Sequence, residues 1–172
     1  GYVDANGNIT SWLNELAFAP VDYREDAPED EWSLDLGSGV QYFSQQAVAR
    51  LASAAGVCFP KAMPLPDRLE AVQQLMSRND PRALKIYSTI GTYLGYAVAH
   101  YAEFYELKAV LLLGRVISGP GGSTIIDRAK DVLRAEFPDL ETQLDIVTLS
   151  EKEKRHGQAI AAASLPPIGG LK

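Results

Sequence analysis

Apolar residues recur at helical spacing through the middle of the chain and predict a series of amphipathic helices. The first runs from Tyr42 to Ala55 and ends near Gly56. The next begins at Pro66, because proline fits the first turn of a helix, and ends around Asn79. The longest opens at Asp80-Pro81 and keeps an apolar stripe as far as Tyr105.

This longest helix contains two glycines one turn apart, Gly91 and Gly95. A glycine in a helix interior costs about 1 kcal/mol relative to alanine. We therefore expect a strand or a second helix to approach the backbone closely there.

In the C-terminal half the pattern alternates between strands and helices. Ala109–Leu113 has no polar alternation, which predicts a strand covered on both faces. Ser123 or Thr124 can cap the helix that follows, residues 144–149 form another strand, and residues 157–165 form a last helix. This order predicts a parallel pair of strands.

The N-terminal region reads as extended chain and loop. A cluster of turn-forming residues, Asp4–Asn8, separates two short apolar runs and predicts an antiparallel hairpin over residues 2–12. The run Glu15–Tyr23 either continues the second strand or pairs beside it. Residues 24–31 are acidic and lack an apolar anchor, which predicts a solvated surface loop. The expected fold is a mixed β-sheet flanked by helices.

Composition excludes several classes of function. A formal net charge of −6 over 172 residues argues against direct nucleic-acid binding, which depends on Lys and Arg at the phosphates. Cys58 is the single cysteine, so no internal disulfide and no structural zinc site of cysteines is expected. The longest apolar run, residues 108–114, is far shorter than the ~20 residues of a membrane span. We expect a cytoplasmic protein with no membrane partner.

Tyrosines and a histidine on the longest predicted helix suggest a ligand site at first sight. Their helical spacing favours packing in the core and at interfaces instead. His100 has no nucleophile or carboxylate at a convincing spacing. The tyrosines are Tyr87, Tyr93, Tyr96, Tyr101 and Tyr105.

Several segments, taken in their order along the chain, carry a resemblance to a known family. They are residues 2–12, 14–18, 86–95, 112–122 and 156–163. On these segments the chain resembles the C-terminal lobe of ROK-family sugar kinases and regulators, within the actin/hexokinase-like ATPase superfamily. The resemblance implies an α/β fold, a ribonuclease H-like lobe that opens with an antiparallel hairpin, and one domain over residues 1–172. It also implies that the chain is part of a larger protein with a second, N-terminal lobe.

Residues 112–122 resemble the adenosine motif of the superfamily, a buried strand that leads into a glycine-rich turn. The resemblance implies that Gly114, Gly119, Gly121 and Gly122 lie near the adenosine of ATP, which binds with Mg²⁺. A side chain at Gly119, Gly121 or Gly122 would obstruct the purine or the ribose. An ordinary strand-to-helix loop is the alternative interpretation.

Residues 14–18 resemble the family's substrate motif, which implies that Glu15 and Asn14 bind sugar hydroxyls. A salt-bridged strand carboxylate is the alternative for Glu15. Phe18 stands where the family has a histidine, and residues 36–40 stand in place of its cysteine-rich zinc loop. No zinc is expected.

The family's phosphate loops and catalytic aspartate have no counterpart in this sequence. Phosphoryl transfer from ATP to a sugar would therefore need the N-terminal lobe of the parent protein. One alternative is a non-catalytic, sugar-sensing transcriptional regulator of the same fold. Another is a structural or oligomerisation lobe. Because lobes of this family commonly associate, the resemblance also implies a homodimer.

Overall fold

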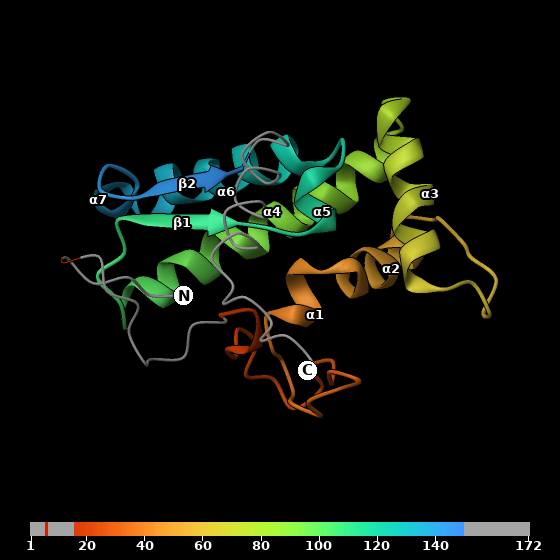
Figure 1. Ribbon diagram of the computed structural model, residues 1–172, viewed down its shortest axis with the longest axis horizontal. Coiled ribbons are helices and arrows are strands. Elements are labelled where there is room, and N and C mark those ends of the chain that lie inside the picture. The colour runs from red at the N-terminus through yellow and green to blue at the C-terminus, as the bar shows by residue number, and fades with distance from the viewer. Residues whose placement is uncertain (1–5, 7–15, 150–172) are drawn as a thin grey trace, which may run out of the picture.

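The computed structural model describes Asn6 and residues 16–149 (Figure 1). The described residues form a mixed α/β unit. In chain order its elements are the 3-10 helix η1 (Leu16–Phe18), α1 (Val40–Phe43), α2 (Gln45–Ala54), α3 (Leu65–Ser77), α4 (Pro81–Ala102), β1 (Ala109–Leu112), α5 (Arg115–Ser118), α6 (Gly122–Glu136), α7 (Pro138–Glu141) and β2 (Asp145–Thr148).

Helix α4 is the central element and confirms the longest predicted helix. Asp80 caps its N-terminus, where the carboxylate accepts the Arg82 backbone N–H at 2.9 Å, and Pro81 occupies the first turn. Its buried face includes Ile86, Ile90 and Val98. The helix ends at Ala102, one turn earlier than its apolar stripe suggests.

The two glycines of α4 mark the closest approach of a neighbouring helix, as expected. A Cβ atom added at Gly91 would lie 2.6 Å from the carbonyl oxygen of Ile125, and one at Gly95 would lie 2.7 Å from Cβ of Val132. Both partners belong to α6, which packs along α4. The glycines therefore allow these two helix backbones to come together.

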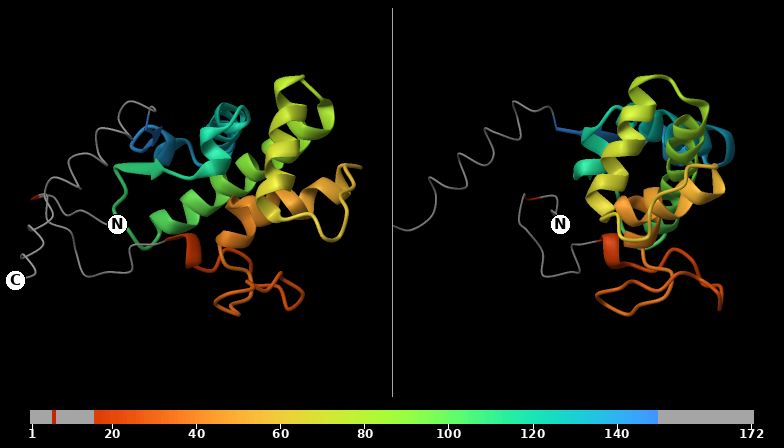
Figure 2. Two further views of the ribbon diagram at one scale, coloured as in Figure 1. Left: turned by 45° about the vertical axis from the view of Figure 1, so that its right-hand side comes forward. Right: turned by 90° about the vertical axis from the view of Figure 1, so that its right-hand side faces the viewer.

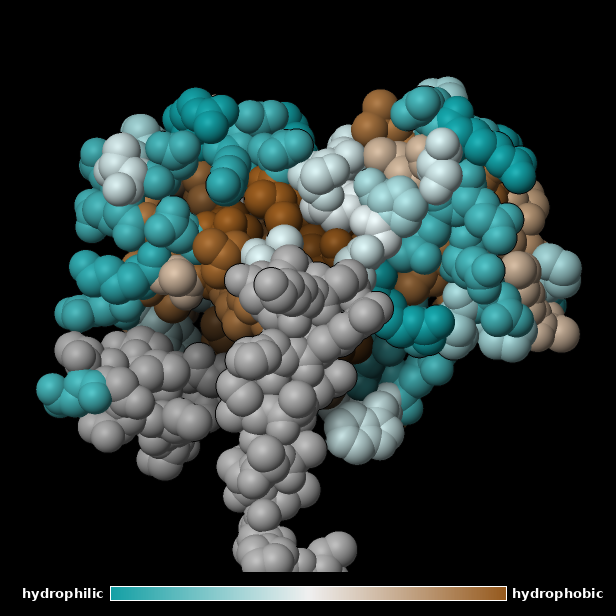
Figure 3. All heavy atoms as spheres, turned by 45° about the horizontal axis from the view of Figure 1, so that its top comes forward, coloured by the Kyte–Doolittle hydropathy of each residue, from teal (hydrophilic) through white to brown (hydrophobic). Residues whose placement is uncertain are grey.

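Strands β1 and β2 form a parallel pair, which confirms the predicted pairing. The register runs from Ala109 opposite Asp145 to Leu112 opposite Thr148. The prediction that β1 is covered on both faces is wrong, because Leu111 and Leu113 are 49% and 62% exposed. Only the face that carries Val110 and Leu112 packs against the core, and apolar residues reach the surface on this side of the molecule (Figure 3).

Helices α1 and α2 replace the single helix predicted over residues 42–55. The break lies at Ser44, whose backbone is extended and whose hydroxyl accepts the Gln46 N–H at 3.1 Å. The side-chain cap therefore starts a new helix rather than continuing the old one. At α6 the expected cap by Ser123 or Thr124 is also wrong, since the helix begins after Gly121 with no side-chain cap.

The segment from η1 to α1 lies on the side of α1 and α2 away from the sheet (Figures 1 and 2). In the described part of the run expected to be extended, residues 16–23, the chain forms the 3-10 helix η1 and only Pro20 pairs as a strand, antiparallel to Ser38. The acidic loop is anchored after all, because Ala27 and Asp30 are buried.

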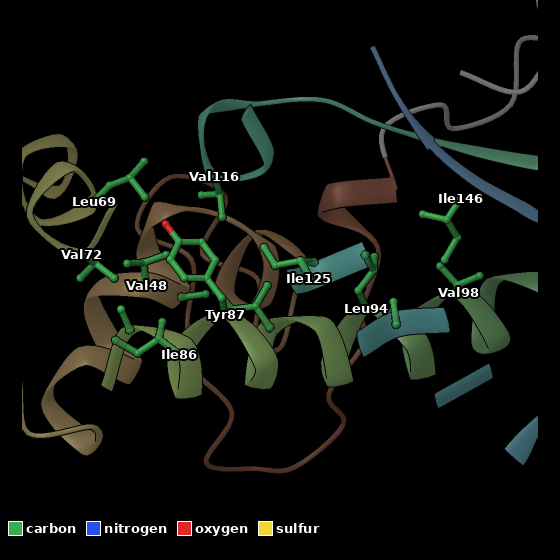
Figure 4. Close-up of a cluster of buried hydrophobic side chains, with 14 of the residues drawn as sticks. Val48, Leu69, Val72, Ile86, Tyr87, Leu94, Val98, Val116, Ile125 and Ile146 are labelled. Carbon is green, nitrogen blue, oxygen red and sulfur yellow. The ribbon is translucent and has the colours of Figure 1, made fainter. Parts of the chain in front are cut away.

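The hydrophobic core lies where α4 meets α2, α3, α5 and α6. Tyr87 is at its centre, fully buried among Val48, Val116 and Ile125 (Figure 4). At the other end of α4, Ile146 of β2 packs near Val98. Among residues 16–149, no helix combines the length and apolar character that a membrane crossing requires.

The predicted hairpin at residues 2–12 and the predicted last helix at residues 157–165 lie outside the described residues. The sheet of the described part therefore contains a parallel pair and no antiparallel hairpin.

Candidate functional site

A cavity of about 450 Å³ opens at the carboxyl end of strand β1. Helix α1 and the start of α2 form one wall, the segment from β1 into α5 forms the other, and α4 with one residue of α6 contributes the floor. Figure 3 shows apolar residues gathered in a hollow of this face, between hydrophilic flanks. The lining residues are Ala17, Val40, Phe43, Ser44, Gln45, Gln46, Ile90, Leu94, Leu112, Leu113, Gly114, Arg115, Val116, Ile117 and Ile125.

The lining is mainly aliphatic and aromatic, with a few polar side chains. Ser44, Gln45 and Gln46 contribute them on the α2 side, and the exposed Arg115 is the charged group. An apolar hollow with a few polar groups is typical of small-molecule binding sites. The volume falls within the range of roughly 300–1,000 Å³ of small-molecule pockets.

Gly114 is the predicted nucleotide-site glycine that lines this cavity. Its φ of +115° lies in a region that other residues rarely adopt, and a Cβ atom added there would meet nothing within 4 Å. Glycine is thus needed at this position for the backbone turn. The same turn leaves open space at the end of β1.

At the other three predicted glycines, atoms of the protein already occupy the space that a side chain would need. A Cβ atom would overlap the side-chain amide of Gln73 at Gly119, the ring of Tyr87 at Gly121 and the carbonyl oxygen of Ile117 at Gly122. Close packing against α3 therefore explains Gly119, close packing against α4 explains Gly121, and the approach of α5 explains Gly122. They do not line the cavity.

The same packing fixes the position of α5 beside the cavity. The side-chain amide of Gln73, on α3, donates to the Arg115 carbonyl at 3.1 Å. Beneath the turn, burial raises the pKa of Tyr87 to about 12, and the Gln73 side chain acts in the opposite direction. The Tyr87 hydroxyl is buried and makes no hydrogen bond of normal geometry to the described residues.

The predicted sugar-binding residues Asn14 and Glu15 lie outside the described residues. The motif continues into η1, where the Leu16 carbonyl accepts a hydrogen bond from the Tyr101 hydroxyl at 3.0 Å. Phe18 packs against Trp32, with ring centroids 6.0 Å apart. Ala17 lines the cavity, so this motif and the strand-to-helix turn meet at one hollow.

Backbone hydrogen bonds close the loop at residues 36–40, where the resemblance has its zinc loop. The N–H of Val21 donates to the Gly37 carbonyl at 2.8 Å, and the N–H of Gly39 donates to the Ala19 carbonyl at 2.9 Å. Gly37 has φ +67°, and a side chain there would overlap the Asp22 backbone. Residues 16–149 contain no cluster of three or more His, Cys, Asp or Glu side chains that could hold a metal ion.

A buried carboxylate holds the preceding acidic loop in place. Asp30 is 1% exposed and accepts the backbone N–H of Ser33 at 2.8 Å and that of Trp32 at 3.1 Å. The side-chain amide of Gln46 donates to its other oxygen at 3.2 Å. These hydrogen bonds lower the pKa of Asp30, and the bond from the Ser33 backbone contributes most. Together with the buried Ala27, this carboxylate anchors the loop.

Sequence reasoning missed one wall of the cavity. Val40 and Phe43 belong to α1, but the predicted helix began only at Tyr42 and Val40 was assigned to the segment 36–40. Gln46 lies on the same wall and contacts Asp30. Nothing in their spacing indicates a ligand site. The break at Ser44 turns them toward β1, and a Ser-Gln-Gln run after an aromatic residue is a weak signal for such a break.

The amino-acid sequence matches no protein-family model and no curated protein.

Proposed function

We propose that this chain is the nucleotide-binding lobe of a ROK-like carbohydrate kinase, with a ribonuclease H-like topology, and that the apolar cavity receives the adenine of ATP. The observation that carries the proposal is the apolar hollow of about 450 Å³ at the carboxyl end of β1, bordered by Gly114. Ligands of open α/β sheets commonly bind just beyond the carboxyl ends of parallel strands.

The chemistry of the lining supports an adenine ring. Leu112, Val116 and Ile117 present apolar surface from one side, and Phe43 does so from the other. Gln45 supplies an amide group that can pair with ring nitrogens, whereas the Gln46 amide is already bonded to Asp30 and Gln41. Because Gly114 has no side chain, the nucleotide can approach the backbone closely.

The phosphates extend toward Arg115 and meet Mg²⁺ in this proposal. An exposed guanidinium at the cavity edge suits a phosphate oxygen. The sugar lies beside the phosphates, with Glu15 and Asn14 on its hydroxyls, because their motif continues into the cavity-lining Ala17. The catalytic base and the phosphate loops come from the N-terminal lobe of the parent protein.

A non-catalytic sugar sensor is the second candidate function. It is favoured by the substitution of Phe18 for the family's histidine and by the loop at residues 36–40, which closes through backbone hydrogen bonds. Such a regulator keeps a ligand site and loses phosphoryl transfer. ATP-dependent phosphorylation of a panel of sugars by the full-length parent protein separates the candidates, since a kinase turns over at least one sugar and a sensor binds without turnover. Glu15→Gln should abolish the response in either case.

Calorimetry with ATP and with adenosine tests the nucleotide site. Ala17→Phe places a ring in the cavity, whereas Ala62→Phe adds the same ring at an exposed loop position and serves as the matched control. We expect Ala17→Phe to lower the affinity for both ligands about tenfold or more. A tenfold loss of affinity corresponds to about 1.4 kcal/mol of binding free energy. Equal affinities for the two variants would contradict an adenine site in this cavity.

A further inference from the structure

A second cleft lies along another side of α4 and shares no lining residue with the apolar cavity. Its volume is about 560 Å³. The segment Val21–Arg24 forms one side, α1 and α2 contribute Tyr42 and Arg50, and the floor comes from one face of α4. The residues of that face are Tyr93, Tyr96, Ala97 and His100.

An ion pair organises one side of this cleft. Arg24 donates from Nε and Nη2 to the Asp22 carboxylate, at 3.1 and 2.8 Å, and the Tyr42 hydroxyl donates to the same carboxylate. Arg24, and then Tyr42, hold the pKa of Asp22 well below its usual range. Asp22 is therefore ionised, and Arg24 balances its charge.

Arg50 supplies a positive charge that is not balanced in this way. Its guanidinium carbon lies 4.9 Å from the centroid of the Tyr42 ring, and Nη2 donates to the Gln41 carbonyl. No carboxylate of residues 16–149 lies within 4.0 Å of this guanidinium. In a chain of net charge −6, this cleft thus combines two arginines with one carboxylate.

Aromatic rings line the remainder of the cleft. Tyr23 is 72% exposed and Tyr96 is 44% exposed, and the Tyr96 hydroxyl donates to the Glu136 carboxylate. The Tyr23 hydroxyl pairs with Nε2 of His100 at 3.1 Å, and Tyr93 meets the Tyr42 ring edge-on at 5.2 Å. Tyrosine offers an apolar face for the C–H side of a sugar ring and a hydroxyl for its oxygens.

We propose that this cleft binds an anionic sugar, a hexose-sized ring that carries a phosphate or carboxylate group, with Arg50 on the anion and the tyrosine rings against the sugar. A planar guanidinium forms paired hydrogen bonds with either anion. The cleft volume fits a ligand of this size. The site does not depend on the nucleotide proposal, because the two hollows are separate.

Calorimetry on this chain tests the proposal with glucose 6-phosphate, glucuronate, glucose and inorganic phosphate as probes. The variants are Arg50→Gln, Arg50→Lys and the control Arg78→Gln, which removes an exposed arginine outside the cleft. We expect glucose 6-phosphate or glucuronate to bind more tightly than glucose and inorganic phosphate. Arg50→Gln should lower the affinity for the probe that binds about tenfold or more, and Arg50→Lys should lower it less. Arg78→Gln should leave that affinity unchanged. Ala17→Phe should also have no effect.

Several results would overturn this site. One is the absence of millimolar binding by both anionic sugars. Another is equal binding of glucose, or of inorganic phosphate, since either the anion or the ring would then contribute nothing. A third is an equal loss of affinity in Arg50→Gln and Arg78→Gln, because the net charge of the protein would then explain the effect. Preference for the phosphate or the carboxylate identifies which anion the cleft takes.

Discussion

At the residue scale, the buried hydroxyl of Tyr87 is the clearest test of how the core is packed. It is fully buried and makes no hydrogen bond of normal geometry to the described residues. An unsatisfied buried polar group costs about 1–3 kcal/mol. We predict that Tyr87→Phe leaves the free energy of unfolding unchanged or raises it by about 1 kcal/mol, measured by urea denaturation. A clear loss of stability would show that the hydroxyl has a partner.

Gly121 belongs to the same packing and not to a ligand surface. Any side chain there would overlap the Tyr87 ring. We predict that Gly121→Ala lowers the free energy of unfolding by about 1–3 kcal/mol, as overpacking does. The control is Ser123→Ala, at an exposed position two residues further along the chain in α6. If Gly121→Ala melts at the wild-type temperature, the glycine serves something other than packing.

At the element scale, the contact between α4 and α6 reverses the usual effect of a helix glycine. Replacing an exposed helix glycine by alanine usually stabilises by up to about 1 kcal/mol. At Gly95 the new Cβ atom would lie 2.7 Å from Val132, so we predict that Gly95→Ala destabilises. Thermal melts of Gly95→Ala and of Ser123→Ala, an exposed position on α6, provide the comparison. Stabilisation by Gly95→Ala would contradict the close contact.

The N-terminus of α4 makes a prediction about pH. Hydrogen bonds from the Arg82 side chain and backbone lower the pKa of Asp80 to about 2, from 3.8. Because the pKa of Asp80 is lower in the folded state than in the unfolded state, its ionised carboxylate stabilises the folded protein at pH values above the unfolded-state pKa. This stabilisation is lost as the pH falls toward 2. Asp80→Asn keeps a capping side chain but loses the charge, so its stability deficit should be present at pH 6 and shrink between pH 4 and pH 2. A deficit that is constant with pH would refute the charge effect.

The elements themselves were largely predictable from local pattern. Periodicity and start signals identified α3, α4, α6 and the parallel pair β1 and β2, and the spacing of Gly91 and Gly95 indicated a close neighbour. The break at Ser44 was missed because a side-chain cap competes with an otherwise continuous apolar pattern. The exposure of Leu111 was missed because an apolar run alone does not tell how many faces are covered.

At the scale of the whole molecule, candidate sites were harder to predict because they depend on contacts between distant segments. Gly114 was predicted as a site residue and lines the cavity. At Gly119, which was predicted with it, the side chain of Gln73 from α3 occupies the space instead of a ligand. The second cleft brings Arg24, Arg50 and Tyr93 together from separate elements. No short motif contains these three residues, so their chemistry becomes visible only after folding.

The central claim is that the hollow beyond β1 holds the adenine of a nucleotide. The most direct measurement is the set of NMR contacts between the adenine protons of ATP and methyl groups of this chain. We predict contacts from adenine H2 or H8 to methyls of Leu112, Val116 and Ile117, which line the cavity, and none to Val21 in the second cleft. Bound ATP whose adenine contacts only residues elsewhere, or no binding at millimolar ATP, would contradict the account.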